Sequence, residues 1–206
     1  MKRIGVAMAL GALAAVPLAG QEIDLGVWVV SPSFQADNVI DAVDAVEIQF
    51  DENLGYGVTG DIHWSDLLST ELGVYGFDAD GSLVLGFLDE ELDLGPLDVM
   101  PITATIRAHF GSDRFDVYVG AGAAYVIFDD LESQDLASSG TERIEIDEEV
   151  TWLANIGLNF MINEGLGIGV DAKWLSLDAD TLSEDGEAVH LELDPLMISA
   201  GIFLRF

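Results

Sequence analysis

The hairpin over residues 99–128 is the feature that most constrains the fold. In its first arm, VMPITATIRAHF, apolar residues alternate with Thr103, Thr105, Arg107 and His109. The second arm, FDVYVGAGAAYVIF, alternates in the same way. A period of two indicates β-strands, and both arms exceed the usual five or six residues. Charged side chains opposite an apolar face favour a barrel in lipid, which is apolar outside and polar inside.

The same alternation recurs along the chain and predicts eight strands. We expect them at about residues 23–34, 54–64, 70–77, 99–110, 115–128, 151–162, 166–177 and 196–206. The short connections are 65–69, 111–114 and 163–165, and the long ones are 35–53, 78–98, 129–150 and 178–195. Short periplasmic turns and long outer loops are typical of outer-membrane barrels, and some of the long segments should extend as strands above the membrane. The sequence therefore predicts an all-β fold, an eight-stranded antiparallel transmembrane β-barrel with both termini on the periplasmic side.

The first twenty residues have the pattern of a secretory signal peptide. Lys2 and Arg3 form a positive n-region, residues 4–16 an apolar core, and residues 17–20 a small-residue exit. A short membrane anchor is the alternative, but the apolar run is shorter than the roughly 20 residues that a spanning helix needs. We therefore expect a signal peptide at 1–20 and a barrel at 21–206, exported to the outer membrane of a Gram-negative bacterium.

Composition excludes several kinds of site. The chain has no Cys, which excludes disulfides and thiolate metal sites. Its 38 acids against 7 bases give a formal net charge of -31, which opposes binding to nucleic acid. Most of the acids fall in the four long segments, where a solvated loop surface is the favoured interpretation and divalent cation binding the alternative. Because no segment contains the spaced DxDxDG pattern, we name no metal site and expect no cofactor.

Strand parity separates a charged lower lumen from an apolar upper lumen. The charged inward positions, which we interpret as a luminal polar plug, are His63, Glu71, Arg107, His109, Asp116, Asp171, Lys173 and Arg205. The apolar inward positions toward the outer end, which we interpret as lining for a small hydrophobic ligand or as ordinary packing, are Trp28, Tyr75, Phe77, Phe128, Leu175 and Met197. An eight-stranded barrel is about wide enough to be filled by its own side chains, which argues against a wide aqueous pore. Buried charges need partners, and we expect Arg107 to pair with Asp116, Asp61 or Asp171.

The sequence gives little support to an enzyme. We expect no Ser near His63 and His109 on their face of the barrel, and the chain contains neither a G-x-S-x-G nor an H-E-x-x-H motif. In the last long segment, His190 could in principle meet Ser183 and either Glu187 or Glu192. We therefore expect no catalytic residues.

The last strand has the pattern of an assembly signal. The terminal residue is aromatic, and apolar residues precede it at a period of two. We assign this signal, which the barrel-assembly machinery would recognise, to Phe206, Leu204 and Ile202.

The chain resembles the outer-membrane protein W (OmpW) family over most of residues 25–206. The resemblance rests on MPITATIRAHF followed by FDVYVGAGAAYVIF, on LGYGVTGDIHW leading to ELGVYGF, and on the closing GIFLRF. It implies an eight-stranded barrel that passes small hydrophobic molecules across the outer membrane, and it allows their release sideways into the bilayer. We expect the exit near Pro101, which cannot donate a ladder hydrogen bond, and we expect a monomer among outer-membrane lipids. The alternative is a structural or surface-interaction barrel without transport, whose acidic loops bind cations or partners.

Overall fold

A computed structural model describes residues 21–35, 46–85, 90–112, 114–128, 148–182 and 188–206. The strands are β1 (Glu22–Gln35), β2 (Val46–Glu52), β3 (Gly55–His63), β4 (Leu68–Leu85), β5 (Glu90–Ser112), β6 (Phe115–Phe128), β7 (Glu149–Asn163), β8 (Leu166–Leu175), β9 (Leu177–Leu182) and β10 (Ala188–Arg205). In this part of the chain no helix is long and apolar enough to cross a bilayer.

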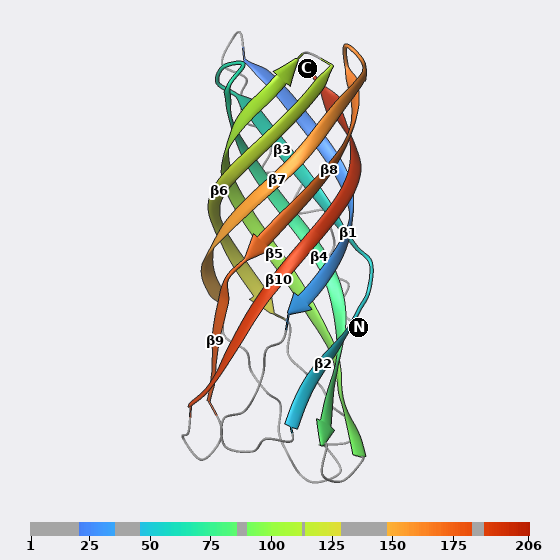
Figure 1. Cartoon of the computed structure of the whole chain (residues 1–206), viewed down its shortest axis with the longest axis vertical. Coiled ribbons are helices and arrows are strands. Elements are labelled where there is room, and N and C mark those ends of the chain that lie inside the picture. Colours follow the sequence, from blue (N-terminus) through green and yellow to red (C-terminus); the bar gives the residue numbers. More distant parts are fainter. Residues whose placement is uncertain (1–20, 36–45, 86–89, 113, 129–147, 183–187) are drawn as a thin grey trace.

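Eight of these strands close into an antiparallel barrel (Figure 1). Around the wall the order is β1, β3, β4, β5, β6, β7, β8 and β10, and β10 pairs with β1 to close it. The closure leaves no free edge within the barrel, as lipid requires of a spanning sheet. The eight-stranded antiparallel barrel predicted from the sequence is confirmed.

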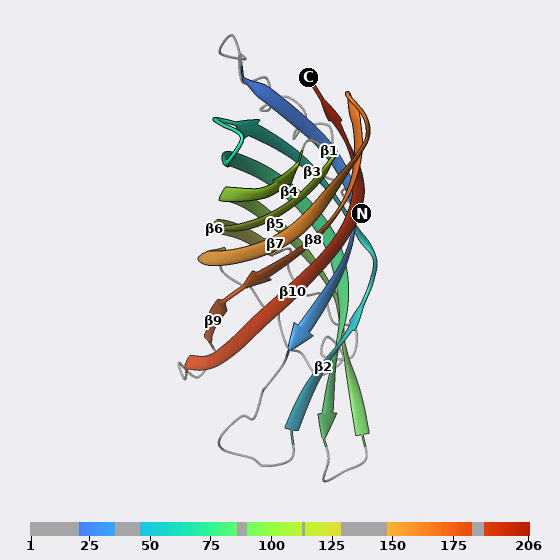
Figure 2. The ribbon, with the colours of Figure 1, turned by 45° about the horizontal axis from the view of Figure 1, so that its top comes forward.

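Two short strands lengthen the wall beyond the barrel, at the end away from the C-terminus. Strand β2 pairs with the outer half of β4, and β9 pairs with the outer half of β10. Figure 2 shows the β9–β10 hairpin and the β2–β4–β5 extension diverging from each other. Segment 78–98, predicted as a loop, is instead mostly strand, because the β4–β5 pairing continues to Leu85 and Glu90 through a bulge after Gly81. The expectation that long segments extend as strands is thus met.

The outer surface carries the apolar side chains of each strand. Exposed residues such as Val27, Ile106 and Ile156 form an apolar band. Exposed aromatic residues border this band at the outer end, with Tyr56, Tyr125, Trp152 and Trp174, and at the periplasmic end, with Trp64, Phe110, Phe115, Phe160 and Phe206. An apolar band between two aromatic girdles is typical of a barrel that crosses a bilayer.

Two sequence-based predictions concern residues outside those described. The signal peptide at 1–20 lies there, as does most of the long segment 129–150 with its acidic residues. The described interior divides into an apolar part near the outer girdle and a polar part below it.

Candidate functional site

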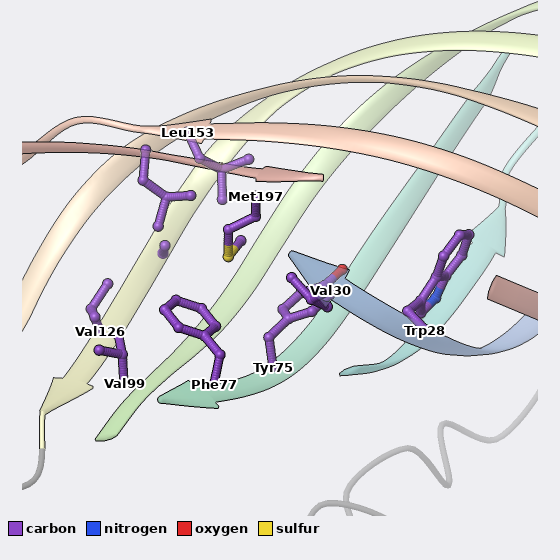
Figure 3. Close-up of a cluster of buried hydrophobic side chains, with 10 residues drawn as sticks. Trp28, Val30, Tyr75, Phe77, Val99, Val126, Leu153 and Met197 are labelled. Carbon is purple, nitrogen blue, oxygen red and sulfur yellow. The ribbon is translucent and has the colours of Figure 1, made fainter. Parts of the chain in front are cut away.

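The upper lumen is filled by an apolar layer. It consists of Trp28, Val30, Tyr75, Phe77, Val99, Ala124, Val126, Leu153, Leu175 and Met197, with the half-buried Phe128 packed against it. Figure 3 shows Tyr75 and Phe77 of β4, Val126 of β6 and Met197 of β10 pointing into a shared interior. No member of the layer is more than 5% exposed. The residues that parity assigned to a ligand lining therefore lie together, and they contact one another rather than an open funnel.

Below this layer lies a polar plug centred on Arg107. Its Nη1 donates to Asp61 Oδ2 at 3.1 Å, its Nη2 donates to Glu71, and Nη2 lies 3.7 Å from Asp171 Oδ2. Lys173 pairs with Asp171, and its Nζ lies 3.2 Å from Glu71 Oε1. These five side chains are at most 7% exposed. Buried charges are stable only when paired, and here each cation contacts at least two carboxylates.

An aromatic ring and an amide complete the plug. The Arg107 guanidinium lies over the Tyr118 ring, 4.3 Å from its centre. The Tyr118 hydroxyl donates to Asp171 Oδ2 at 2.8 Å, and Asn155 Nδ2 donates to the same oxygen at 3.0 Å. The prediction that Arg107 pairs with Asp61 or Asp171 is correct, but Asp116 is not its partner. The third carboxylate in contact with Arg107 is Glu71, which that prediction did not include.

Nearest the periplasm lies a polar floor made of two histidine–aspartate pairs. Asp24 accepts hydrogen bonds from Arg205 Nε at 2.8 Å and Nη2 at 2.7 Å, and from His63 Nε2 at 3.0 Å. His109 Nδ1 donates to Asp116 Oδ2 at 2.7 Å. The rings of the two histidines are in contact, with their centres 5.0 Å apart.

The expectation that no Ser lies near His109 is wrong. A 2.7 Å hydrogen bond joins Ser69 Oγ to His109 Nε2, so Ser69, His109 and Asp116 follow the order of a hydrolytic triad. Ser69, however, has no exposed surface and is paired with Arg107 in the β4–β5 ladder. A substrate carbonyl cannot reach its hydroxyl, so the three residues act as packing and hydrogen-bonding groups. The other possible triad, around His190, involves Ser183 and Glu187, which lie outside the described residues.

A cavity of about 420 Å³ lies at the periplasmic turns, next to the floor. It is lined by Glu22, Arg114, Met161, Ile162, Asn163, Glu164 and Arg205. The polar floor and plug therefore stand between this cavity and the apolar layer.

The wall beside the apolar layer is interrupted between β4 and β5. The ladder pairs Val74 with Ile102 and Phe77 with Val99 in one register, but it skips the two positions between them. Pro101 occupies one of these positions and has no N–H to donate. Beneath the interruption lie Phe77 and Val99, which belong to the apolar layer.

The C-terminal strand closes the barrel and presents its predicted signal residues outward. The backbone of Phe206 exchanges two hydrogen bonds with Ile23, at 2.9 and 3.2 Å. The side chains of Ile202, Leu204 and Phe206 are 57%, 48% and 71% exposed on the lipid-facing surface.

Sequence reasoning missed several luminal residues. Asp24 has the same strand parity as Trp28, so its inward position is predictable from the sequence. In the barrel it lies opposite Arg205 in the β1–β10 ladder. Ser69, predicted to lie in the turn 65–69, is the second residue of β4. Thr103, Thr105 and Tyr118 lie on the polar face of the hairpin but were given no role, although all are buried.

Comparisons with known proteins agree with this geometry. The model of the OmpW family matches residues 23–206. An uncharacterised outer-membrane protein of Sinorhizobium fredii is 28% identical over 167 residues, which cover 73% of this chain and 71% of that protein. Among solved structures, the outer-membrane protein OprG of Pseudomonas aeruginosa has a TM-score of 0.69 at 18% identity, covering 91% of this chain and 96% of OprG. The outer-membrane protein AlkL has a TM-score of 0.60 at 19% identity, covering 91% of this chain and 90% of AlkL. The chain therefore belongs to the OmpW family and is an outer-membrane β-barrel.

Proposed function

We propose that the barrel passes small hydrophobic molecules from the outside to the membrane and releases them sideways between β4 and β5. The observation that carries the proposal is the interrupted ladder at Pro101, which lies beside the apolar layer. The likeness to the OmpW family, for which such a role is expected, supports it.

A straight path to the periplasm is opposed by the plug. A solute on that path must displace the side chains of Arg107, Glu71 and Asp171, which hold one another by charged contacts. Separating a buried ion pair leaves an uncompensated charge and costs roughly 3–5 kcal/mol. An apolar solute offers no hydrogen bond to offset that loss.

A sideways path is favoured by the apolar character of the solute, which also opposes the straight path through the plug. The apolar layer is held mainly by packing, beside one buried hydrogen bond from Trp28 Nε1 to Thr59 Oγ1, so an apolar guest can replace contacts between its members. A solute that leaves through the wall enters the bilayer, where its apolar surface stays out of water at a gain of roughly 25 cal/mol per Å². At the interruption, the ladder supplies fewer hydrogen bonds that must break.

A reversible cross-link across the interruption tests the proposal. The chain has no native Cys, so Gly76→Cys with Met100→Cys places one cysteine pair at a skipped ladder position. A Cβ at Gly76 meets no atom within 4 Å, and directly opposed residues lie within disulfide range. The matched control is Ile156→Cys with Ala172→Cys, a pair in the part of the β7–β8 ladder, from Leu153 to Met161, that skips no position.

Uptake of a hydrophobic fluorescent probe into cells or liposomes is the measurement. The oxidised Gly76/Met100 pair should lower uptake toward that of membranes without the protein, and reductant should restore it. The oxidised control pair should take up the probe like the wild type. Equal uptake with and without wild-type protein would favour the alternative of a structural or surface-interaction barrel.

A further inference from the structure

The described charges below the apolar layer do not balance when the histidines are neutral. Among the buried and half-buried groups, five carboxylates face three permanent cations and two histidines: Asp24, Asp61, Glu71, Asp116 and Asp171 against Arg107, Lys173 and Arg205, with His63 and His109. Glu22, opposite His63 in the ladder and 3.9 Å from Arg205, is exposed at the rim and is not counted. The lumen is therefore two charges negative, and the charges balance when both histidines are protonated. Two uncompensated negative charges in a narrow barrel within lipid are unfavourable.

The excess charge lies where the histidines lie. Asp116 is paired with His109 and, among the described residues, with no cation that is charged at every pH. Asp24, Asp61 and Glu71 stand side by side in register on β1, β3 and β4. In this row Asp61 Oδ1 and Glu71 Oε1 have no hydrogen-bond partner among the described residues, and of the two oxygens Glu71 Oε1 lies close to a cation, 3.2 Å from Lys173 Nζ.

His63 lies beside this row. It is two residues from Asp61 on the same face of β3, and it contacts Asp24. His63 is thus the histidine beside the carboxylate row, and His109 is the histidine paired with Asp116.

We propose that His63 and His109 form a proton-binding pair that controls the charge of the polar floor. When both are protonated, each donates to its own aspartate and the lumen is neutral. When both lose their protons, the floor and the plug together carry two excess negative charges, one in each. Histidine is the side chain that ordinarily changes its charge between pH 5 and pH 8.

The charged and polar neighbours of each ring set how the pair behaves. His63 faces Asp24 of β1, Asp61 of β3 and Arg205 of β10. His109 faces Ser69 of β4, Arg107 of its own strand, and Asp116 and Tyr118 of β6. Because the two rings are in contact, a proton bound to one ring opposes a proton on the other.

The direction in which pH changes the stability of the barrel follows from the charge balance of the lumen. Toward pH 6 the floor gains two charged hydrogen bonds and loses its repulsion, so the folded barrel is more stable. Toward pH 8 the protons leave and that contribution is lost. The floor then repels its own carboxylates and attracts cations from the periplasmic side.

The test is the urea midpoint of the full barrel in detergent micelles at pH 6 and pH 8. Between these values carboxylates stay ionised and histidine is the side chain whose unperturbed charge changes. The wild type should have the higher midpoint at pH 6. His63→Gln with His109→Gln should abolish the difference, while His190→Gln, which changes the histidine on the outer part of β10, should keep it. A difference that persists in the double variant would overturn the proposal.

If the double variant does not fold, NMR of the imidazoles in the His190→Gln barrel decides. Each of the two remaining histidines should gain a proton as the pH is lowered from 8 to 5. A ring that stays neutral to pH 5 would overturn the pair.

Discussion

The apolar layer and the polar plug are built from the same strands but are held together differently. In the layer, Val30, Leu175 and Met197 are buried by packing and need no particular partner. In the plug, Arg107 and Lys173 need carboxylates at defined positions. Packed apolar groups can exchange one neighbour for another, whereas a paired charge cannot leave without exposing its partner. The plug therefore fixes the lumen, and under the proposed function the layer is the part that would admit a guest.

Removing the central cation should have the largest effect. Arg107→Ala leaves Asp61 and Glu71 without their shared partner and should lower the free energy of unfolding by about 3–5 kcal/mol. Arg114→Ala, at an exposed position, should change it by no more than about 0.5 kcal/mol. Urea unfolding in micelles measures both. An equal effect of the two substitutions would remove the distinction between plug and surface.

Truncating the apolar layer should cost somewhat less stability and should change transport. Leu153→Ala removes a fully buried side chain and should cost about 2–4 kcal/mol. The space it leaves should raise the uptake of a hydrophobic probe per folded barrel. Ile156→Ala, on the lipid-facing side of the same strand, is the control and should leave uptake unchanged. Lower uptake in Leu153→Ala would mean that the layer binds the guest through this side chain.

The loss of stability on neutralising a carboxylate of the plug should depend on how many cations that carboxylate contacts. Glu71→Gln weakens contacts to Arg107 and Lys173 and should cost about 1–3 kcal/mol. Asp61→Asn should cost less, because Asp61 contacts one cation among the described side chains, Arg107, and lies in the carboxylate row. The unfolding midpoints of the two variants give the ranking, and the reverse order would contradict it.

The terminal residue should matter for assembly more than for stability. Deleting Phe206 removes an exposed side chain and two terminal backbone hydrogen bonds to Ile23, and it should lower the free energy of unfolding of the barrel that does fold by about 1 kcal/mol. The amount of heat-modifiable, folded protein in the membrane should nevertheless fall. Phe206→Trp keeps a terminal aromatic and should restore that amount. Wild-type levels after the deletion would refute the assembly signal.

The fold could be predicted because strand parity is a strong signal. Along β5, Thr103, Thr105, Arg107 and His109 alternate with apolar residues, and all four are buried in the barrel. A shift by one residue would put every charge into lipid, so the register has one acceptable choice. The same reasoning separates the charged lower lumen from the apolar upper one.

The partners inside the lumen could not be predicted to the same degree. Parity gives the face of a residue, but the tilt and stagger of the strands decide which residues meet across the barrel. Arg107 therefore meets Glu71, whereas the nearby Asp116 turns to His109. Ser69 was missed because β4 begins within the segment taken as a turn.

Flux through the wild-type barrel in liposomes is the most direct test of a closed lumen with a sideways exit for apolar solutes. A hydrophobic probe, a charged solute of similar size and a sugar should be compared in liposomes with and without the protein. The protein should speed accumulation of the hydrophobic probe in the membrane and leave the charged solute and the sugar excluded, because the plug around Arg107 blocks the lumen. Rapid sugar flux, or a large and steady ion conductance, would contradict it.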